Sequence, residues 1–346
     1  MKPETWNSIA LVSVVLLFAA GCVTVPPESE PPPARIGGQP QPRPAPTPTP
    51  RVKPPPLTPP KPEVPFRDAV AIQTLLDRRN FSCNCADGVI GTKTRQALRA
   101  WQGANGLPVT GKPDELTVAR LGPLDAAFTT HTVTDEELAA LTPVPKTWWG
   151  KSQAAQLGYE TLLELIAEKY HAAEEAVRKL NPDAAWPSPP AGTTLVVPNP
   201  RPSNIPKADS LTILLNEKLV RARDADGRLV AQFPCSIAKD KEKRPAGVLT
   251  VVNCASEPTY TLDPAVFLED KEVQALGKRL IIPPGPNNPV GVAWITLSLP
   301  GYGMHGTPRP EEIGRTGSHG CFRLANWNAE KLIRMIRIGM PVTVEE

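Results

Sequence analysis

The stretches YGMHGT at residues 302–307 and GSHGCFRL at residues 317–324 bring together two of the four histidines and one of the six cysteines of the chain. A thiol is only slightly ionised near neutral pH, so a nucleophilic cysteine needs a nearby base, and an imidazole can supply it. We therefore predict that Cys321 is a nucleophile and that His305 is its general base. Gly320 permits the tight turn and the close main-chain approach that an oxyanion site requires.

Other interpretations of these residues are structural or metal-binding. A single cysteine is more often a small buried apolar residue, and a single histidine is more often a hydrogen-bonded structural residue. A zinc site made by His305, His319 and Cys321 would have suitable ligand types, but the spacings match no common zinc pattern. The sequence also lacks a glycine-rich phosphate loop, a helical His-Glu-x-x-His and repeated Cys-x-x-Cys pairs. We therefore expect neither a metal nor a cofactor.

Strand-like runs surround the two stretches over residues 208–346. An Asp226-Gly227 pair marks a hairpin, a further run spans residues 292–299, and an amphipathic helical pattern follows near residues 328–338. We predict a mainly β catalytic domain, sandwich- or barrel-like, with one C-terminal helix. The connection over residues 255–290 is long for a simple link between strands, and we expect it to form a lid or a substrate wall lined by Tyr260.

The pattern His-Gly-Thr followed by Ser-His-Gly-Cys-x-Arg-Leu resembles the YkuD-type L,D-transpeptidase family, as does the closing Gly-Met-Pro-Val at residues 339–342. The resemblance implies that Cys321 attacks the bond between diaminopimelate and D-alanine in a tetrapeptide stem of peptidoglycan. D-alanine leaves, and an amine resolves the thioester to give a 3→3 cross-link. His305 takes the thiol proton and later the proton of the incoming amine.

The same resemblance implies supporting roles for residues around this pair. The carbonyl of Gly306 would orient the imidazole, as the third group of a triad does. His319 and Gly320 would share an oxyanion pocket with the N–H of Cys321, and Ser318 belongs to the motif. Arg323 would hold the loop or a substrate carboxylate.

The sequence leaves the acceptor open. Water would make the protein an L,D-carboxypeptidase, and a protein lysine would attach a lipoprotein to the wall. An interpretation of another class is a non-catalytic anchor that links membrane and wall, because a fold can outlive its activity. The intact motif from Ser318 to Arg323 argues against that anchor.

Residues 66–123 have the pattern of a three-helix module, with apolar residues on one stripe of the first helix. The run DGVIGTKTRQALRAWQGANGLPVTGKPDELT at residues 87–117 resembles the peptidoglycan-binding domain-1 family. This resemblance implies binding to the glycan or the stem peptide of the wall, without chemistry of its own. The alternative is that these residues build only turns and a small core.

Residues 129–200 predict a small α+β module in the order strand, helix, helix, strand. The pieces LLELIAEKYHAAEEAVRKLNP and AGTTLVVPN resemble the LysM module, which binds glycans containing N-acetylglucosamine. The usual Gly-Asp-Thr-Leu start is absent, so a structural spacer is the alternative. We expect His171, at a helix end, to be exposed to solvent.

Residues 1–22 predict a lipoprotein signal peptide, with an apolar run before the sequence Ala-Ala-Gly-Cys that resembles a lipobox ending at Cys22. An ordinary cleaved signal with an incidental cysteine is the alternative. Residues 23–65 are rich in proline and predict a disordered tether, which could reach roughly 120 Å in an extended polyproline conformation. We expect a lipid-anchored protein facing the periplasm of a bacterial envelope. Val23 favours the outer membrane.

Composition limits the partners. The 346 residues include 38 basic and 35 acidic side chains, a formal charge of +3 that lacks the strongly basic character of nucleic-acid-binding proteins. The expected partners are peptidoglycan, the membrane through the N-terminal lipid, and a wall-attached lipoprotein if one is the acceptor. Cys235 and Cys254 could form a disulfide in an oxidising envelope, whereas Cys83 and Cys85 are too close to pair with each other.

Overall fold

The computed structural model describes residues 64–202, 204–317 and 320–346, which belong to a unit that spans Pro59–Glu346. The predicted signal peptide with Cys22, and the tether up to residue 63, lie outside the described residues. So do Ser318 and His319. Each helix in the described part of the chain is too short or too polar to cross a membrane.

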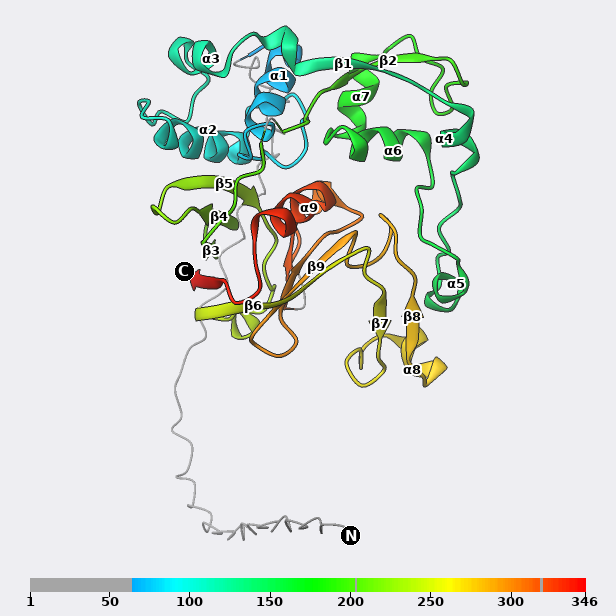
Figure 1. The fold of residues 1–346 in the computed structure, drawn as a ribbon. Coiled ribbons are helices and arrows are strands. Elements are labelled where there is room, and N and C mark those ends of the chain that lie inside the picture. The colour runs from blue at the N-terminus through cyan, green and yellow to red at the C-terminus, as the bar shows by residue number, and fades with distance from the viewer. Residues whose placement is uncertain (1–63, 203, 318–319) are drawn as a thin grey trace, which may run out of the picture. The chain divides into compact units, whose positions relative to one another are not determined.

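The first module is helical, as predicted (Figure 1). Its described residues form α1 (Phe66–Asp77), α2 (Thr92–Ala104) and α3 (Glu115–Leu121). Their apolar faces share a core that includes Ile72, Leu98 and Trp101. The side chain of Asp114 accepts the N–H of Thr117 at 2.9 Å and caps α3.

The middle module contains the predicted order of strand, helix, helix and strand. The antiparallel strands β1 (Phe128–Thr132) and β2 (Thr194–Pro198) pack against α6 (Leu162–Lys169) and α7 (Glu174–Leu180), as Figure 1 shows. Two further helices, α4 (Asp135–Ala139) and α5 (Trp148–Gln153), occupy the long insertion after β1. The indole N–H of Trp148 on α5 donates to Asp270 of the β domain at 2.9 Å.

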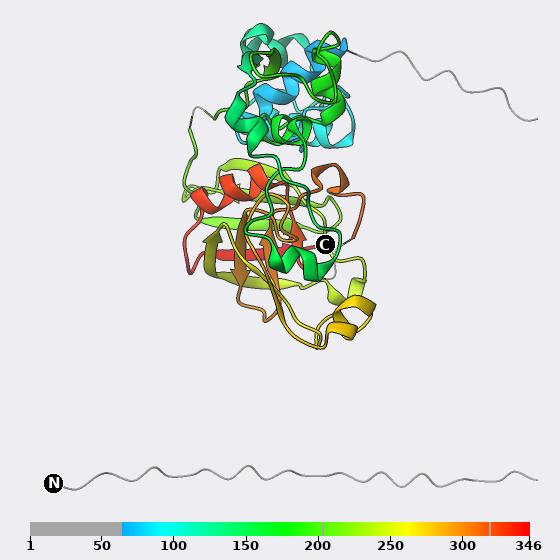
Figure 2. The same cartoon turned by 90° about the vertical axis from the view of Figure 1, so that its right-hand side faces the viewer.

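The predicted β domain with one C-terminal helix is confirmed. Among the described residues its sheet has eight strands in the order β11-β10-β9-β6-β12-β3-β4-β5. Their bounds are β3 Ser210–Leu214, β4 Leu219–Arg223, β5 Leu229–Pro234, β6 Gly247–Ser256, β9 Ala293–Leu297, β10 Gly303–His305, β11 Phe322–Arg323 and β12 Pro341–Glu345. Helix α9 (Asn326–Met335) packs onto the sheet through Leu332 and Met335 (Figures 1 and 2).

The sheet curls strongly enough to meet itself. The register shifts in β6 between Val251 and Asn253, and an irregularity of this kind bends a strand. Beyond β5, Ser236 and Arg323 exchange backbone hydrogen bonds of 2.8 and 3.0 Å, which join the two ends of the sheet. The predicted barrel-like character therefore comes from one curled sheet.

Residues 255–290 form a folded subdomain beside this sheet. Its strands β7 (Tyr260–Leu262) and β8 (Leu280–Ile282) are antiparallel, and α8 (Lys271–Leu276) lies between them in the sequence. Leu157, from the insertion of the middle module, is buried with Leu262 and Ile282. Short 3-10 turns complete the described elements at Leu124–Ala127, Lys241–Lys243 and Pro310–Glu312.

The suggested disulfide between Cys235 and Cys254 is wrong. Within the described ranges, Cys83, Cys85, Cys235 and Cys254 form no disulfide. Cys235 follows β5 and is fully buried, whereas Cys254 lies on β6. Because β12, β3 and β4 separate these two strands in the sheet order, the two cysteines do not face each other on neighbouring strands.

One buried ion pair connects all three modules. The Lys331 ammonium on α9 lies 2.8 Å from a carboxylate oxygen of Asp77 on α1, and both side chains are almost fully buried. His171 of the middle module contacts the same oxygen through Nδ1 at 2.7 Å. Its ring stacks on Trp327 of α9 with centroids 5.0 Å apart. The expectation that His171 is exposed to solvent is therefore wrong, because partners from two other modules cover it.

Burial alone would raise the pKa of Asp77. The charge of Lys331 has the larger opposing effect and His171 the next, and together they lower the pKa of this carboxyl to about 2. Burial lowers the pKa of His171. Asp77 is therefore ionised at neutral pH and balances the buried charge of Lys331. Its contribution to stability is present above the unfolded pKa of about 3.9 and is lost as pH falls toward about 2.

Replacing Asp77 tests this connection. Asp77→Asn leaves the Lys331 ammonium buried without a counter-charge, so we expect the free energy of unfolding at pH 7 to fall by about 3–5 kcal/mol. The matched control is Asp209→Asn, which removes an exposed ion pair with Arg337 and should cost less than about 1 kcal/mol. Equal losses in denaturant titrations of the two variants would contradict the role of Asp77.

Candidate active site

A short parallel strand pair positions the predicted nucleophile and base. In β10 and β11, Met304 lies opposite Phe322 and His305 lies opposite Arg323. Met304 and Phe322 are fully buried in the core of the domain. Because side chains alternate between the two faces of a strand, His305 and Arg323 lie on the face turned away from that core. Cys321 directly precedes β11, so it lies on the segment next to the strand that carries His305.

The imidazole of His305 is held in one orientation. Its Nδ1 lies 2.6 Å from the carbonyl oxygen of Gly306, and its ring stacks on Trp294 of β9 with centroids 5.4 Å apart. A carbonyl can only accept a hydrogen bond, so Nδ1 carries the proton and Nε2 is the basic nitrogen. Among the described residues, the imidazole forms its hydrogen bond through Nδ1 and none through Nε2.

Burial keeps both candidate groups uncharged. The pKa of His305 is lowered to about 4, mainly by burial. The hydrogen bond to the Gly306 carbonyl acts to raise this pKa, and the charge of Arg323 acts to lower it further. Burial also raises the pKa of the Cys321 thiol, while a backbone hydrogen bond at Gly303 acts in the opposite direction. The thiol lies 3.6 Å from the carbonyl oxygen of Gly301. At neutral pH the site therefore holds a thiol and a neutral imidazole.

Asn326 supports the backbone beside His305, and the sequence analysis missed it. A Cβ atom on Gly306 or on Gly291 would collide with Oδ1 of Asn326, so both glycines allow this side chain to lie against the main chain. Asn326 Nδ2 donates to both carboxylate oxygens of Glu168, at 3.0 and 3.1 Å. Burial raises the pKa of Glu168 to about 7. Glu168 of the middle module is therefore connected through Asn326 to Gly306, whose carbonyl orients the imidazole.

Other predicted residues lie around the same strand pair. Arg323 Nη2 donates to the Thr316 carbonyl and hydroxyl oxygens, at 3.0 and 2.8 Å, and to the Gly317 carbonyl at 2.9 Å. Arg323 therefore binds the loop that leads toward the cysteine. Gly320 lies beside the ring of Tyr302. A Cβ atom built on Gly320 would be in van der Waals contact with this ring, at 3.7 Å.

Tyr260 lies on β7 in the predicted wall. Burial raises the pKa of its phenol to about 12, and the charge of a Cys321 thiolate contributes in the same direction. The ring of Tyr260 packs edge-on against Phe267 at 6.3 Å. Tyr260 is therefore within electrostatic range of the thiol.

Two family models match the chain. Residues 209–344 match the L,D-transpeptidase catalytic domain called YkuD. The β domain is therefore similar to the L,D-transpeptidase catalytic domain over almost its whole length. Residues 67–121 match a model described as "Putative peptidoglycan binding domain". Together the two matches cover the helical first module and the β domain that carries Cys321 and His305.

Relatives of the transpeptidase domain cover about half of the chain. The chain is 27% identical over 183 residues to "Putative L,D-transpeptidase YkuD" of Bacillus licheniformis. This alignment covers 53% of this chain and 92% of the Bacillus licheniformis protein. It is 28% identical over 188 residues to "Probable L,D-transpeptidase YcfS" of Escherichia coli. This alignment covers 53% of this chain and 58% of the Escherichia coli protein. Among solved structures, an L,D-transpeptidase from Xylanimonas cellulosilytica is 18% identical, with a TM-score of 0.34, and covers 83% of this chain and 100% of that chain.

The protonation states of His305 and Cys321 predict how Cys321 reacts with an alkylating agent. Because the pKa of Cys321 is raised and His305 is neutral above about pH 4, the alkylation rate should rise only toward alkaline pH. His305→Ala should leave this profile nearly unchanged. Iodoacetamide labelling followed by intact mass, in a Cys254→Ala background, measures it. A rate plateau between about pH 5 and pH 8 that disappears in His305→Ala would instead reveal a thiolate–imidazolium pair.

Proposed function

We propose that the protein is a cell-wall L,D-transpeptidase that makes 3→3 cross-links through a thioester on Cys321. The observation that carries the proposal is the β10–β11 strand pair. It holds a neutral imidazole, with Nδ1 fixed by Gly306, next to the segment that carries the thiol. The match of residues 209–344 to the L,D-transpeptidase catalytic domain supports the choice of reaction.

In the first half-reaction, Nε2 of His305 takes the thiol proton while Sγ of Cys321 attacks the carbonyl carbon between diaminopimelate and D-alanine. We assign the stabilisation of the oxyanion to main-chain N–H groups at Gly320 and Cys321. The family resemblance adds His319, which lies outside the described residues. The carbon–nitrogen bond then breaks. The imidazolium gives its proton to the leaving amine, and D-alanine departs from the thioester.

In the second half-reaction, the amine of another stem peptide attacks the thioester carbonyl. His305 takes a proton from this amine as the new amide bond forms. The carbon–sulfur bond breaks, and the imidazolium returns the proton to the leaving thiolate. A neutral resting pair suits both steps, because an imidazole that is already protonated could not act as a base.

The other modules would keep the catalytic domain on its polymer. The peptidoglycan-binding match at residues 67–121 supports wall binding, which raises the effective substrate concentration without new contacts in the active site. We assign the LysM-like middle module a supporting role, because its Glu168 contacts Asn326 behind the active site. The proposed lipid on Cys22 and the proline-rich tether would place the protein in the bacterial envelope, facing the periplasm.

Product analysis with soluble substrate tests the function. We expect the protein to convert disaccharide tetrapeptides into cross-linked dimers with release of D-alanine, detected by mass spectrometry. Cys321→Ala should lower the rate by at least about 10³-fold, since removal of a nucleophile leaves only residual catalysis. Cys254→Ala, which removes another partly exposed thiol, is the matched control and should retain the wild-type rate.

The products distinguish the possible acceptors. Tripeptide alone, with D-alanine release that depends on Cys321, would point to water or to a missing protein amine as the acceptor. Equal turnover by the wild type and Cys321→Ala would contradict the proposed mechanism. Binding to sacculi without any turnover would favour a non-catalytic anchor.

A further inference from the structure

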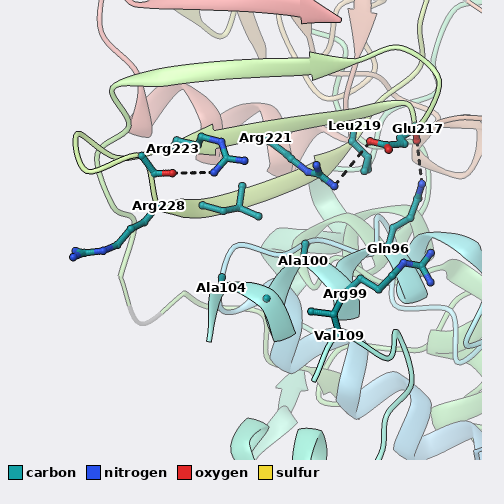
Figure 3. A pocket seen from close by; sticks show the side chains of 13 residues that line it. Gln96, Arg99, Ala100, Ala104, Val109, Glu217, Leu219, Arg221, Arg223 and Arg228 are labelled. Atoms are coloured by element: carbon teal, nitrogen blue, oxygen red, sulfur yellow. Dashed lines mark hydrogen bonds and ion pairs between the residues drawn. The ribbon is translucent and has the colours of Figure 1, made fainter. Parts of the chain in front are cut away.

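A basic cavity lies where the first module meets the β domain. Its volume is about 720 Å³, and its walls come from α2 and from the region of β4 and β5. Figure 3 shows Arg221 and Arg223 on the strand side and Arg99 on the helix side. None of its lining residues belongs to the site described around Cys321.

The alternation of β4 explains how this cavity forms. Val220 and Ala222 are fully buried in the core of the β domain. Leu219, Arg221 and Arg223 therefore lie on the opposite face, where they line the cavity. The first module is fixed against the neighbouring strand β5, because the Ser82 N–H donates to the Gln232 carbonyl at 2.9 Å and the Gln232 N–H donates to the Asn80 carbonyl at 2.9 Å.

The lining is unusually rich in arginine. Four arginines and one glutamate are the charged side chains among the described residues that line it, namely Arg99, Arg221, Arg223, Arg228 and Glu217. Arg221 Nε donates to the Gln232 side-chain oxygen at 2.9 Å, and Arg223 Nη1 donates to the Gly227 carbonyl at 2.9 Å. These bonds hold two guanidinium groups in place, so less side-chain freedom is lost when an anion binds.

This arrangement favours a ligand that carries carboxylates. A guanidinium matches a carboxylate in planar, two-point geometry, and the half-buried side chain of Leu229 can contact short aliphatic side chains. Arg221 lies 3.9 Å from a carboxylate oxygen of Glu217, and Arg228 lies 2.9 Å from one of Asp226. Among the described residues, Arg99 and Arg223 form no ion pair, so a neutral glycan would leave these two charges without a carboxylate. The site therefore suits an acidic peptide better than an N-acetylated sugar.

We propose that the cavity between α2 and β4–β5 binds the carboxylates of an uncross-linked stem peptide, at a second site separate from the catalytic one. The identity of the polymer rests on the proposed function, whereas the charge and position of the cavity do not. Such a site would hold the wall at the junction of the two modules. A stem bound there would not occupy the reacting position at Cys321.

Cosedimentation with purified sacculi tests the proposal on the full chain. Arg221→Gln combined with Arg223→Gln should weaken binding about tenfold, through the loss of about 1.4 kcal/mol of interaction with carboxylates. The matched control is Arg120→Gln, which removes an exposed arginine of the same first module outside the cavity and should bind like the wild type. Thermal melting of each variant shows whether it is folded.

Treatment of the sacculi identifies the ligand. Removal of the stem peptides by an amidase, or amidation of their carboxylates, should lower wild-type binding to the level of the double variant and leave the variant almost unaffected. Undiminished binding by the folded double variant, or undiminished wild-type binding to stem-free glycan, would overturn the proposal. Sedimentation requires no turnover, so this result is separate from that of the Cys321 assay.

Discussion

The buried carboxylate of Asp77 is the constraint on which the arrangement of the modules depends. A buried ammonium is costly without a counter-charge, so α9, which carries Lys331, is stable in its position only when α1 supplies Asp77. His171 adds the middle module to the same contact. The first residue of α9 is Asn326, which lies against Gly306 beside the imidazole. One ion pair therefore couples the helical module to the backbone of the active site.

The active site itself depends on burial more than on charge. Its imidazole is neutral because it lies beneath Trp294 and inside the domain, and its thiol is neutral for the same reason. A resting site of this kind does not keep a reactive thiolate. In our account the nucleophile forms only when a substrate carbonyl is in place and His305 can take the proton. Such a site would restrict side reactions of the thiol in an oxidising envelope.

Sequence patterns predicted the parts of the structure that are determined by residues close together in the sequence. Glycine-rich stretches around His305 and Cys321 indicated the proposed catalytic pair, which the assays above test. Strand-like runs and one amphipathic stretch predicted the β domain and α9. The environment of His171 was not predictable, because its partners Asp77 and Trp327 are distant in the sequence. Asn326 and Glu168 were missed for the same reason: their contacts arise from packing between modules, which no local periodicity reveals.

The central claim is that Cys321 carries the acyl group between donor and acceptor, and the mass of the intermediate tests it most directly. Protein mixed briefly with disaccharide tetrapeptide and quenched in acid should gain the mass of the substrate less D-alanine. Peptide mapping should place this mass on the fragment that contains Cys321. Cross-linked product that accumulates with no adduct on Cys321, or with the acyl group on another residue, would contradict the account.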